Sequence, residues 1–308
     1  SILFLVGFIT SYSTNTPQNA LDVVYTTITA VDAFRLAQNA QISTVPGTSA
    51  GQLSGARVNA LLDAIDWPAT MRDVDPGLTT MQADPGTART ALAALTTVET
   101  SEYGALYVDA TGSFVFQDRA LTASSVSGTP VEFNDDGTDI SYFDAVWVLN
   151  DTLVYNTANV TRAGGSVQTA SDAASIAKYF LHSYNKSDLL MQTTAEALNY
   201  ALAYVASRQE TTVRCDSVTL LDLNTEGYDA GVAAALELDF FDTITVKSTQ
   251  PNSVGTSTLN KTLQIFGVSY NITPTRWSTT FVTLEPIIES FIIGNANYGQ
   301  LGINVLSY

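Results

Sequence analysis

The chain has 308 residues, enough for one large domain or two to three small ones, and its 13 basic and 30 acidic residues give a formal net charge of −17. Such a charge argues against a protein that grips nucleic acid through its phosphates. Charged residues make up only 14% of the chain, against about a quarter in an average protein. The surface is therefore mostly Thr, Ser, Asn and Gln, which suits a subunit buried among neighbours.

The first predicted elements form a strand pair. Residues 2–10 and 21–30 are rich in β-formers around a polar turn, and a short helix from Asp32 to Gln38 follows. The opening run from Ile2 to Val6 is too short to cross a bilayer and lacks a basic flank, so neither a signal peptide nor a membrane anchor is predicted.

A compact α/β module follows between residues 52 and 119. Its first helix is predicted from the helical spacing of Leu53, Val58, Leu61, Leu62 and Ile65, and Pro68 ends it. After Pro85 and Gly86, a second helix is predicted from Ala88, Ala91, Leu92, Leu95 and Val98. Two alternating strands, 102–109 and 112–119, then make a hairpin.

The middle of the chain combines strands with helices. Residues 122–128 read as a polar linker, and residues 134–137 as a solvated turn, because their acids lack the ligand spacing of an EF-hand calcium loop. Strands are expected from Tyr142 to Thr161, a short helix from Ala170 to Phe180, and a stronger helix from Thr193 to Arg208. The alanine-rich stripe of the last helix packs either on the neighbouring sheet or on another subunit.

The final part of the chain predicts a small antiparallel barrel. Its four strands are expected at residues 212–223, 234–246, 261–272 and 279–284, and the apolar residues 291–294 and 301–302 would need a partner surface. Cys215, the only cysteine, is expected to pack on the first strand as a small hydrophobe whose thiol pKa is raised by burial.

Residues for nucleophilic or metal chemistry are scarce. His182 is the only histidine, so a Ser/His/Asp triad is disfavoured and His182 is expected to be a surface or capping residue. One cysteine and one histidine cannot supply a zinc site, and Gly164-Gly165 lacks the Gly-Lys-Ser/Thr of a phosphate loop. We therefore predict no catalytic residue, no metal and no cofactor.

Paired carboxylates are the remaining catalytic possibility, because a glycosidase needs only two acids that face a cleft. The candidate pairs are Glu99 with Glu102 and Glu237 with Asp239. We expect Glu102 to be solvated at a helix end and the second pair to alternate along a barrel strand, so both pairs are interpreted as structural.

Sugar binding is a milder alternative, since Trp67, Trp147 and Trp277 could stack on glycans.

Three blocks of sequence resemble a known family. The first block runs from Arg57 to Pro68, continues through residues 72–77 and 98–99, and includes Gly104, Asp109, Gly112 and Arg119. The second covers residues 156–165, 168–170, 172 and 175–177, and the third is Trp277 after Pro274. In this order they are similar to the minor tail or tail-hub proteins of long-tailed phages.

The resemblance implies a mostly β, α+β fold of antiparallel β-barrel-like hub domains with α/β insertion modules. It also implies structural roles for Arg57, Trp67, Pro68, Gly77, Gly104, Asp109, Gly112, Arg119, Asn156, Arg162, Gly164, Gly165, Asp172, Ser175 and Trp277. The domains expected are the end of a first barrel at 1–48, whose start lies before this chain, the α/β module at 49–121, a middle module at 122–211, and a second barrel with an apolar tail at 212–308.

The function implied is that of a non-enzymatic tail-hub subunit at the distal end of a phage tail. We expect a homotrimer whose ring joins the tail-tube protein to other tip proteins and lets tape-measure protein and DNA pass. The acidic surface either keeps DNA from sticking during passage or serves only solubility. The alternatives are a tail-associated glycan or peptidoglycan hydrolase and a receptor-binding or glycan-binding tip module.

Overall fold

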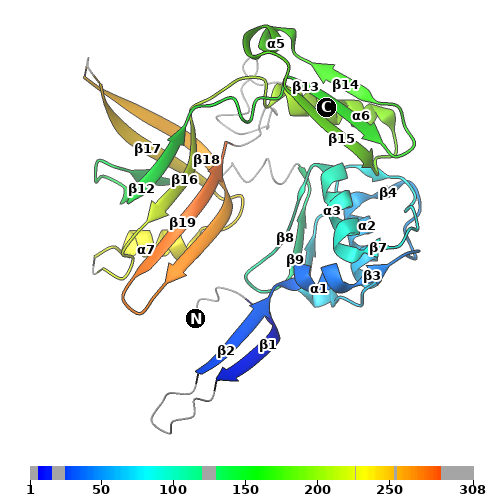
Figure 1. Cartoon of the computed structure of the whole chain (residues 1–308), viewed down its shortest axis with the longest axis horizontal. Coiled ribbons are helices and arrows are strands. Elements are labelled where there is room, and N and C mark those ends of the chain that lie inside the picture. The colour runs from blue at the N-terminus through cyan, green and yellow to red at the C-terminus, as the bar shows by residue number, and fades with distance from the viewer. Residues whose placement is uncertain (1–5, 16–24, 120–129, 226, 253–254, 286–308) are drawn as a thin grey trace. The chain divides into compact units, whose positions relative to one another are not determined.

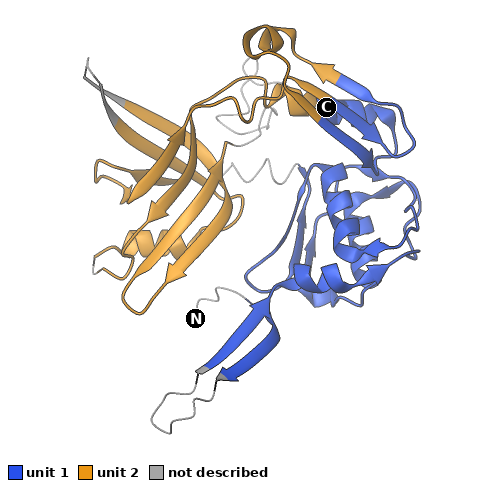
Figure 2. Cartoon of the chain, in the orientation of Figure 1, with its two compact units in different colours: residues 1–119, 159–169, 185–201 blue, residues 120–158, 170–184, 202–308 orange. Residues whose placement is uncertain are grey.

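The computed structural model describes residues 6–15, 25–119, 130–225, 227–252 and 255–285. The predicted polar linker at 122–128 and the apolar residues 291–294 and 301–302 lie outside these ranges. The chain divides into two compact units (Figure 2). Unit 1 consists of residues 1–119, 159–169 and 185–201, and unit 2 of residues 120–158, 170–184 and 202–308. Within the described ranges, no helix is both long and apolar enough to cross a membrane.

The predicted fold class is confirmed, because the described part is an α+β structure with more strand than helix (Figure 1). The first hairpin is formed by β1 (Phe8–Asn15) and β2 (Tyr25–Val31), which pair antiparallel. Residues 11–15 extend β1, although the sequence suggested a turn there. Thr and Ser are tolerated in a strand whose partner supplies the hydrogen bonds, and Thr14 and Thr26 lie side by side across this pair.

The α/β module of unit 1 has the predicted helix, helix and hairpin. Helix α2 (Ser54–Asp63) and helix α3 (Ala91–Glu102) pack together, and β8 (Ala105–Val108) pairs antiparallel with β9 (Phe114–Gln117). The core contains most of the predicted apolar positions of both helices, but Leu53 and Ala88 lie before the helices and are exposed. Its buried side chains include Val58, Leu61, Leu62, Leu95, Val98, Phe114 and Phe116.

Shorter elements complete this module. Helix α1 (Ala33–Asn39) is capped by the side chain of Asp32, and a 3-10 turn, η1 (Ala69–Met71), leads into β5 (Arg72–Val74), which runs parallel to β9. Two short antiparallel pairs flank the helices. They are β3 (Gln41–Ile42) with β7 (Arg89–Thr90), and β4 (Gln52–Leu53) with β6 (Thr80–Met81).

A three-stranded sheet of order β14-β13-β15 and helix α6 (Thr194–Ala206) contain residues of both units. The strands are β13 (Thr157–Arg162), β14 (Gln168–Ser171) and β15 (Ser183–Leu189). The predicted helix after residue 170 is shorter than expected, since α5 spans Ala173–Tyr179 and the residues before it belong to β14.

The sheet of unit 2 has seven strands in the order β11-β10-β17-β18-β19-β16-β12 and is curled (Figure 1). Its strands are β10 (Val131–Asn134), β11 (Ile140–Ser141), β12 (Asp144–Val148), β16 (Arg214–Leu220), β17 (Thr243–Asn252), β18 (Gly255–Ile272) and β19 (Trp277–Leu284). The residues of β10, β11 and β12 were assigned to the predicted middle module at 122–211. In the part described, the sheet is open, because β11 and β12 are its two ends.

Two features of this sheet differ from the predicted antiparallel barrel. Strand β10 runs parallel to both β11 and β17. The predicted strand at 234–246 is wrong in its first half, where α7 (Asp229–Glu237) lies instead and buries Ala234 and Ala235. A short apolar run is ambiguous by periodicity alone, and the strong helix propensity of alanine and leucine agrees with the helix observed.

Candidate functional site

Arg57 is an internal anchor of the α/β module. Its side chain is fully buried in α2, where Nε donates to Oε1 of Gln52 (2.8 Å) and Nη2 donates to the carbonyls of Ser49 (3.1 Å) and Gln82 (2.6 Å). Burial lowers the pKa of the guanidinium, and Asp84 opposes that shift by raising it. A buried arginine bound mostly to carbonyls shapes the loops around it and has no free face for a substrate.

Glu102 corrects a prediction, because it is completely buried and not solvated. Its carboxylate accepts hydrogen bonds from the Ser54 hydroxyl (2.7 Å) and from the backbone N–H groups of Leu78 (3.2 Å) and Thr79 (2.8 Å). Arg119 lies at 3.9 Å from the carboxylate and donates to the Thr79 hydroxyl and to the Glu102 carbonyl. These bonds hold the carboxylate in place and fix the turn that follows β5.

Gly77 makes this turn possible. It has φ +79°, and a Cβ there would lie 1.8 Å from Oγ of Ser54, the same hydroxyl that binds Glu102. Gly77 therefore meets two requirements at once, a left-handed backbone and a close approach.

The remaining motif positions of the module are also structural. Trp67 packs edge-on against Phe8 and Phe114 and donates to the Met71 carbonyl, while Pro68 caps η1. The others are Gly104, where a Cβ would meet the Gln117 carbonyl at 2.2 Å, Asp109, which accepts three hydrogen bonds from Thr111 and Ser113, and Gly112, with φ +83°. Together these residues shape the β8–β9 hairpin and allow it to pack against the helices.

Asn156 organises the end of α5. Its buried amide donates to the Phe180 carbonyl (2.6 Å) and accepts from the backbone N–H of His182 (2.9 Å). Asp172 caps α5 by accepting from the Ser175 N–H, and the buried Ser175 hydroxyl donates to the Gln209 carbonyl. These three motif residues hold α5 onto the segment that follows α6.

The last motif positions lie in two turns. Between β13 and β14, Gly164 has φ +67°, and a Cβ on Gly165 would meet the Arg162 side chain at 2.5 Å. This is the plain turn expected there in place of a phosphate loop. Trp277 begins β19, pairs with Ile272, and its carbonyl accepts from the Leu223 N–H.

Sequence reasoning missed one junction, which joins β6 to the segment around Met191. Gln82 donates through its amide to the carbonyls of Ala163 (3.0 Å) and Met191 (2.8 Å). Glu196 accepts from the N–H and hydroxyl groups of both Thr80 and Thr193. Burial alone would raise the pKa of Glu196, but these hydrogen bonds outweigh it and lower the pKa. The only sequence signal is Thr193 with Glu196 three residues later, which is a helix capping box.

The remaining candidate acids, Glu99, Glu237 and Asp239, lie near or just after the C-terminal ends of α3 and α7. Glu99 accepts from the Leu106 N–H, and burial raises its pKa. Glu237 ends α7 and Asp239 lies in the loop after it, so the expected alternation along a strand is wrong.

His182 is partly exposed, and its Nε2 lies 4.0 Å from the Asp151 carboxylate. Within the described residues, no group of three or more His, Cys, Asp or Glu side chains could hold a metal.

Cys215 behaves as predicted. It is buried in β16, and desolvation raises the pKa of its thiol to about 11.

Exposed apolar side chains gather on β elements. On the first hairpin, Ile9, Tyr12 and Ile28 are 67%, 76% and 61% exposed. The base of the hairpin is anchored by Phe8 against Trp67, but residues 9–14 of β1 and 26–30 of β2 are exposed on both faces of the ribbon. A two-stranded ribbon with no covered face is marginally stable by itself, so this hairpin is a candidate contact with another chain.

A second such surface lies at β12, an end strand of the seven-stranded sheet. Phe143, Val146 and Leu149 are exposed on or beside it. An end strand with apolar neighbours is a template for pairing with another molecule.

Comparison with known proteins relates the fold to viral tails. No protein-family model and no curated protein matches the chain. The tail protein from Neisseria meningitidis MC58 matches 92% of this chain and 81% of its own, with a TM-score of 0.60 and 13% identity. The 43 kDa tail protein of prophage MuSo2 from Shewanella oneidensis matches 92% of this chain and 78% of its own, with a TM-score of 0.57 and 10% identity. The chain has the fold of phage tail proteins. At this identity the tail-protein fold is what the comparison establishes.

Proposed function

We propose that this chain is a structural subunit of a phage tail. The observation that carries the proposal is the exposed β1–β2 ribbon, whose apolar side chains have no cover within the described part of the chain. A surface of this kind is stabilised when another protein covers it. The solved structures that share this fold are named tail proteins, which agrees with an assembled subunit.

The finer role proposed is that of a tail hub. In this role the chain forms a homotrimer at the distal end of the tail, where its ring joins the tail-tube protein to other tip proteins. Tape-measure protein and DNA pass through this ring, and the net charge of −17 keeps DNA from adhering to it.

The proposed role needs no catalysis. Among the motif positions, the buried Asn156 and Ser175 side chains are bound to backbone partners, and the candidate acids Glu102 and Glu99 accept hydrogen bonds from the module itself. Such groups stabilise loops and turns, and a hydrolase would need two acids open to a cleft.

Sedimentation of the purified chain, alone and with the tail-tube protein of the same phage, tests the proposal. We expect a homotrimer that binds the tube protein, and electron microscopy of tails labelled on this chain should show label at the distal end. A stable monomer that ignores the tube protein contradicts the proposal. A zymogram on host cell walls is the check for hydrolase activity, and a cleared band there would replace the structural role with an enzymatic one.

A further inference from the structure

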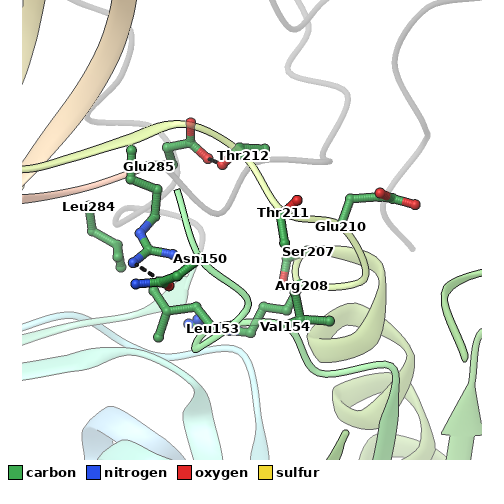
Figure 3. A pocket seen from close by; sticks show the side chains of 11 residues that line it. Asn150, Leu153, Val154, Ser207, Arg208, Glu210, Thr211, Thr212, Leu284 and Glu285 are labelled. Carbon is green, nitrogen blue, oxygen red and sulfur yellow. Dashed lines mark hydrogen bonds between the residues drawn. The ribbon is translucent and has the colours of Figure 1, made fainter. Parts of the chain in front are cut away.

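A small recess in unit 2 is lined by the segment after β12, the segment after α6, and the ends of β16 and β19 (Figure 3). The lining residues are 150, 153–154, 207–208, 210–212, 214 and 284–285. The volume of the recess is about 100 Å³, and a water molecule takes up about 30 Å³ in the liquid. The recess therefore has room for one small oxyanion, and an ion bound there is within reach of the long side chains that line it.

Arg214 brings a largely buried guanidinium to the recess, since the residue is only 9% exposed. Its Nε donates to Oδ1 of Asp216 (3.2 Å), and its Nη2 donates to Oδ1 of Asn150 (3.3 Å). Within the described residues Nη1 donates no hydrogen bond, and it is not among the buried atoms that lack a partner. The two contacts therefore orient the guanidinium and leave Nη1 open to an acceptor.

Arg208 brings a second guanidinium, which is held by stacking. It lies over the Tyr204 ring, 4.9 Å from the centroid, and the Tyr204 ring is stacked on that of Tyr184 at 3.8 Å. None of its guanidinium nitrogens donates a hydrogen bond within the part of the chain that the structure describes, and only Nε is buried. Stacking on an aromatic ring leaves the edge of the planar guanidinium fork free for an oxyanion.

The charge around the recess is positive, although the whole chain is acidic. The acids that line the recess or contact its arginines are paired, and the pairs are Glu210 with Lys178, Glu285 with Lys261, and Asp216 with Arg214. Arg208 adds a fourth cation to these three acids and three cations. At physiological salt the Debye length is about 8 Å, so this local balance counts for more than the distant acids.

We propose that this recess binds a terminal phosphate group, either of inorganic phosphate or of a phosphomonoester. Its oxygens accept hydrogen bonds from the free donors of Arg214 and Arg208. Phosphate suits two arginines better than a carboxylate does, because it has more acceptor oxygens and close to twice the charge. The phosphates of duplex DNA have a sugar on both sides and do not fit so small a space. The inference goes beyond the proposed tail role and does not rest on it.

The test follows the amide resonances of residues 207–214 by NMR while phosphate is added to the full chain at constant ionic strength. A pH of 7.5 lies above the second pKa of a phosphomonoester, about 6. We expect resonance shifts that saturate with phosphate, and acetate should bind at least tenfold more weakly. Arg208→Gln and Arg214→Gln should each weaken phosphate binding about tenfold or more. The matched control is Arg35→Gln, an exposed arginine on α1, which should leave it unchanged.

Glu210→Gln adds a test that misfolding cannot imitate, because it predicts a gain of binding. The Glu210 side chain is half exposed, and its substitution leaves Lys178 without its acid. This change makes the surroundings of the recess more positive, so phosphate should bind several-fold more tightly.

Three results would overturn the proposal. They are an absence of saturable shifts with phosphate, acetate binding as tight as phosphate binding, and wild-type phosphate affinity in both arginine variants. Should Arg214→Gln fail to fold, Arg208→Gln and Glu210→Gln decide the matter. The same titration with glycerol 3-phosphate identifies the source of the group. Equal affinity shows that the phosphate of a monoester enters the recess, and binding of inorganic phosphate alone shows that the free ion is the ligand.

Discussion

At the scale of single residues, we expect substitution of Glu102 to lower the free energy of unfolding strongly. In Glu102→Gln, one carboxylate oxygen becomes an NH₂ group that faces the N–H groups of Leu78 and Thr79 or the Ser54 hydroxyl. Buried donors without acceptors cost about 1–3 kcal/mol each. We expect unfolding in urea to show a loss of about 2–4 kcal/mol.

The matched control is Glu237→Gln, since Glu237 is exposed at the end of α7. It should change the unfolding free energy by less than about 0.5 kcal/mol. Equal stabilities of Glu102→Gln and the wild type would show that the carboxylate does not hold the turn at Leu78 and Thr79.

Glu99, three residues earlier, should respond in the opposite sense. Burial raises its pKa, although the Leu106 N–H and Lys186 oppose the shift. A carboxyl whose pKa is higher in the folded state contributes stability that is full below the unfolded pKa and is lost as pH rises through the folded pKa. Glu99→Gln removes this loss, so its stability relative to the wild type should increase between pH 4 and pH 7. Denaturant midpoints at the two pH values measure this, and a difference that stays constant or shrinks contradicts it.

The contrast between these two acids shows where residue-level prediction ends. Both residues lie near the C-terminal end of α3, and the sequence alone predicted that Glu102 is exposed to solvent there. Its donors come from Ser54, Leu78 and Thr79, which only the folded chain brings together. Gly77 and Asn156 were singled out by resemblance, and their close contacts follow from packing that no local pattern encodes.

At the scale of elements, local periodicity correctly predicted the helices and the hairpin whose contacts are local in sequence. Helices α2 and α3 and the β8–β9 hairpin follow from residues that are neighbours in sequence. The parallel pairing of β10 with β17 does not, because no feature of either strand specifies a partner so distant in sequence. Helix α7 was missed although its alanines favour a helix, because a short apolar run cannot be assigned to helix or strand by periodicity alone.

The junction at β6 provides a prediction at this scale. Gln82→Ala removes two donors, one to the Ala163 carbonyl and one to the Met191 carbonyl. We expect the amides of Leu190 and Gln192, which are bound to Ser101 and to Thr80, to exchange about tenfold faster, as a loss of about 1.4 kcal/mol implies.

Hydrogen exchange followed by mass spectrometry or NMR measures the effect. Gln117→Ala is the matched control, because that amide binds the Tyr107 hydroxyl within the β8–β9 hairpin. Exchange at residues 190 and 192 that is equally slow in both variants would show that the backbone bonds alone hold the junction.

At the scale of the whole molecule, the charge predicts behaviour toward DNA. With 30 acidic and 13 basic residues, the chain cannot release counterions from the phosphates as a basic protein does. In a mobility-shift assay at physiological salt we expect no complex with duplex DNA, which corresponds to a dissociation constant weaker than about 10⁻⁴ M. A saturable complex at micromolar protein would contradict a passage role and favour a DNA-gripping one.

The pairing of β10 with β17 also affects how this chain folds during its synthesis on the ribosome. More than a hundred residues separate the two strands, and at about 5–20 residues per second the first is synthesised roughly 5–20 s before its neighbour. During that interval Val131 and Phe133 have no β17 to pair with. Nascent unit 2 is therefore a natural client for chaperones, and slower translation of the segment between the strands should lower the yield of soluble protein.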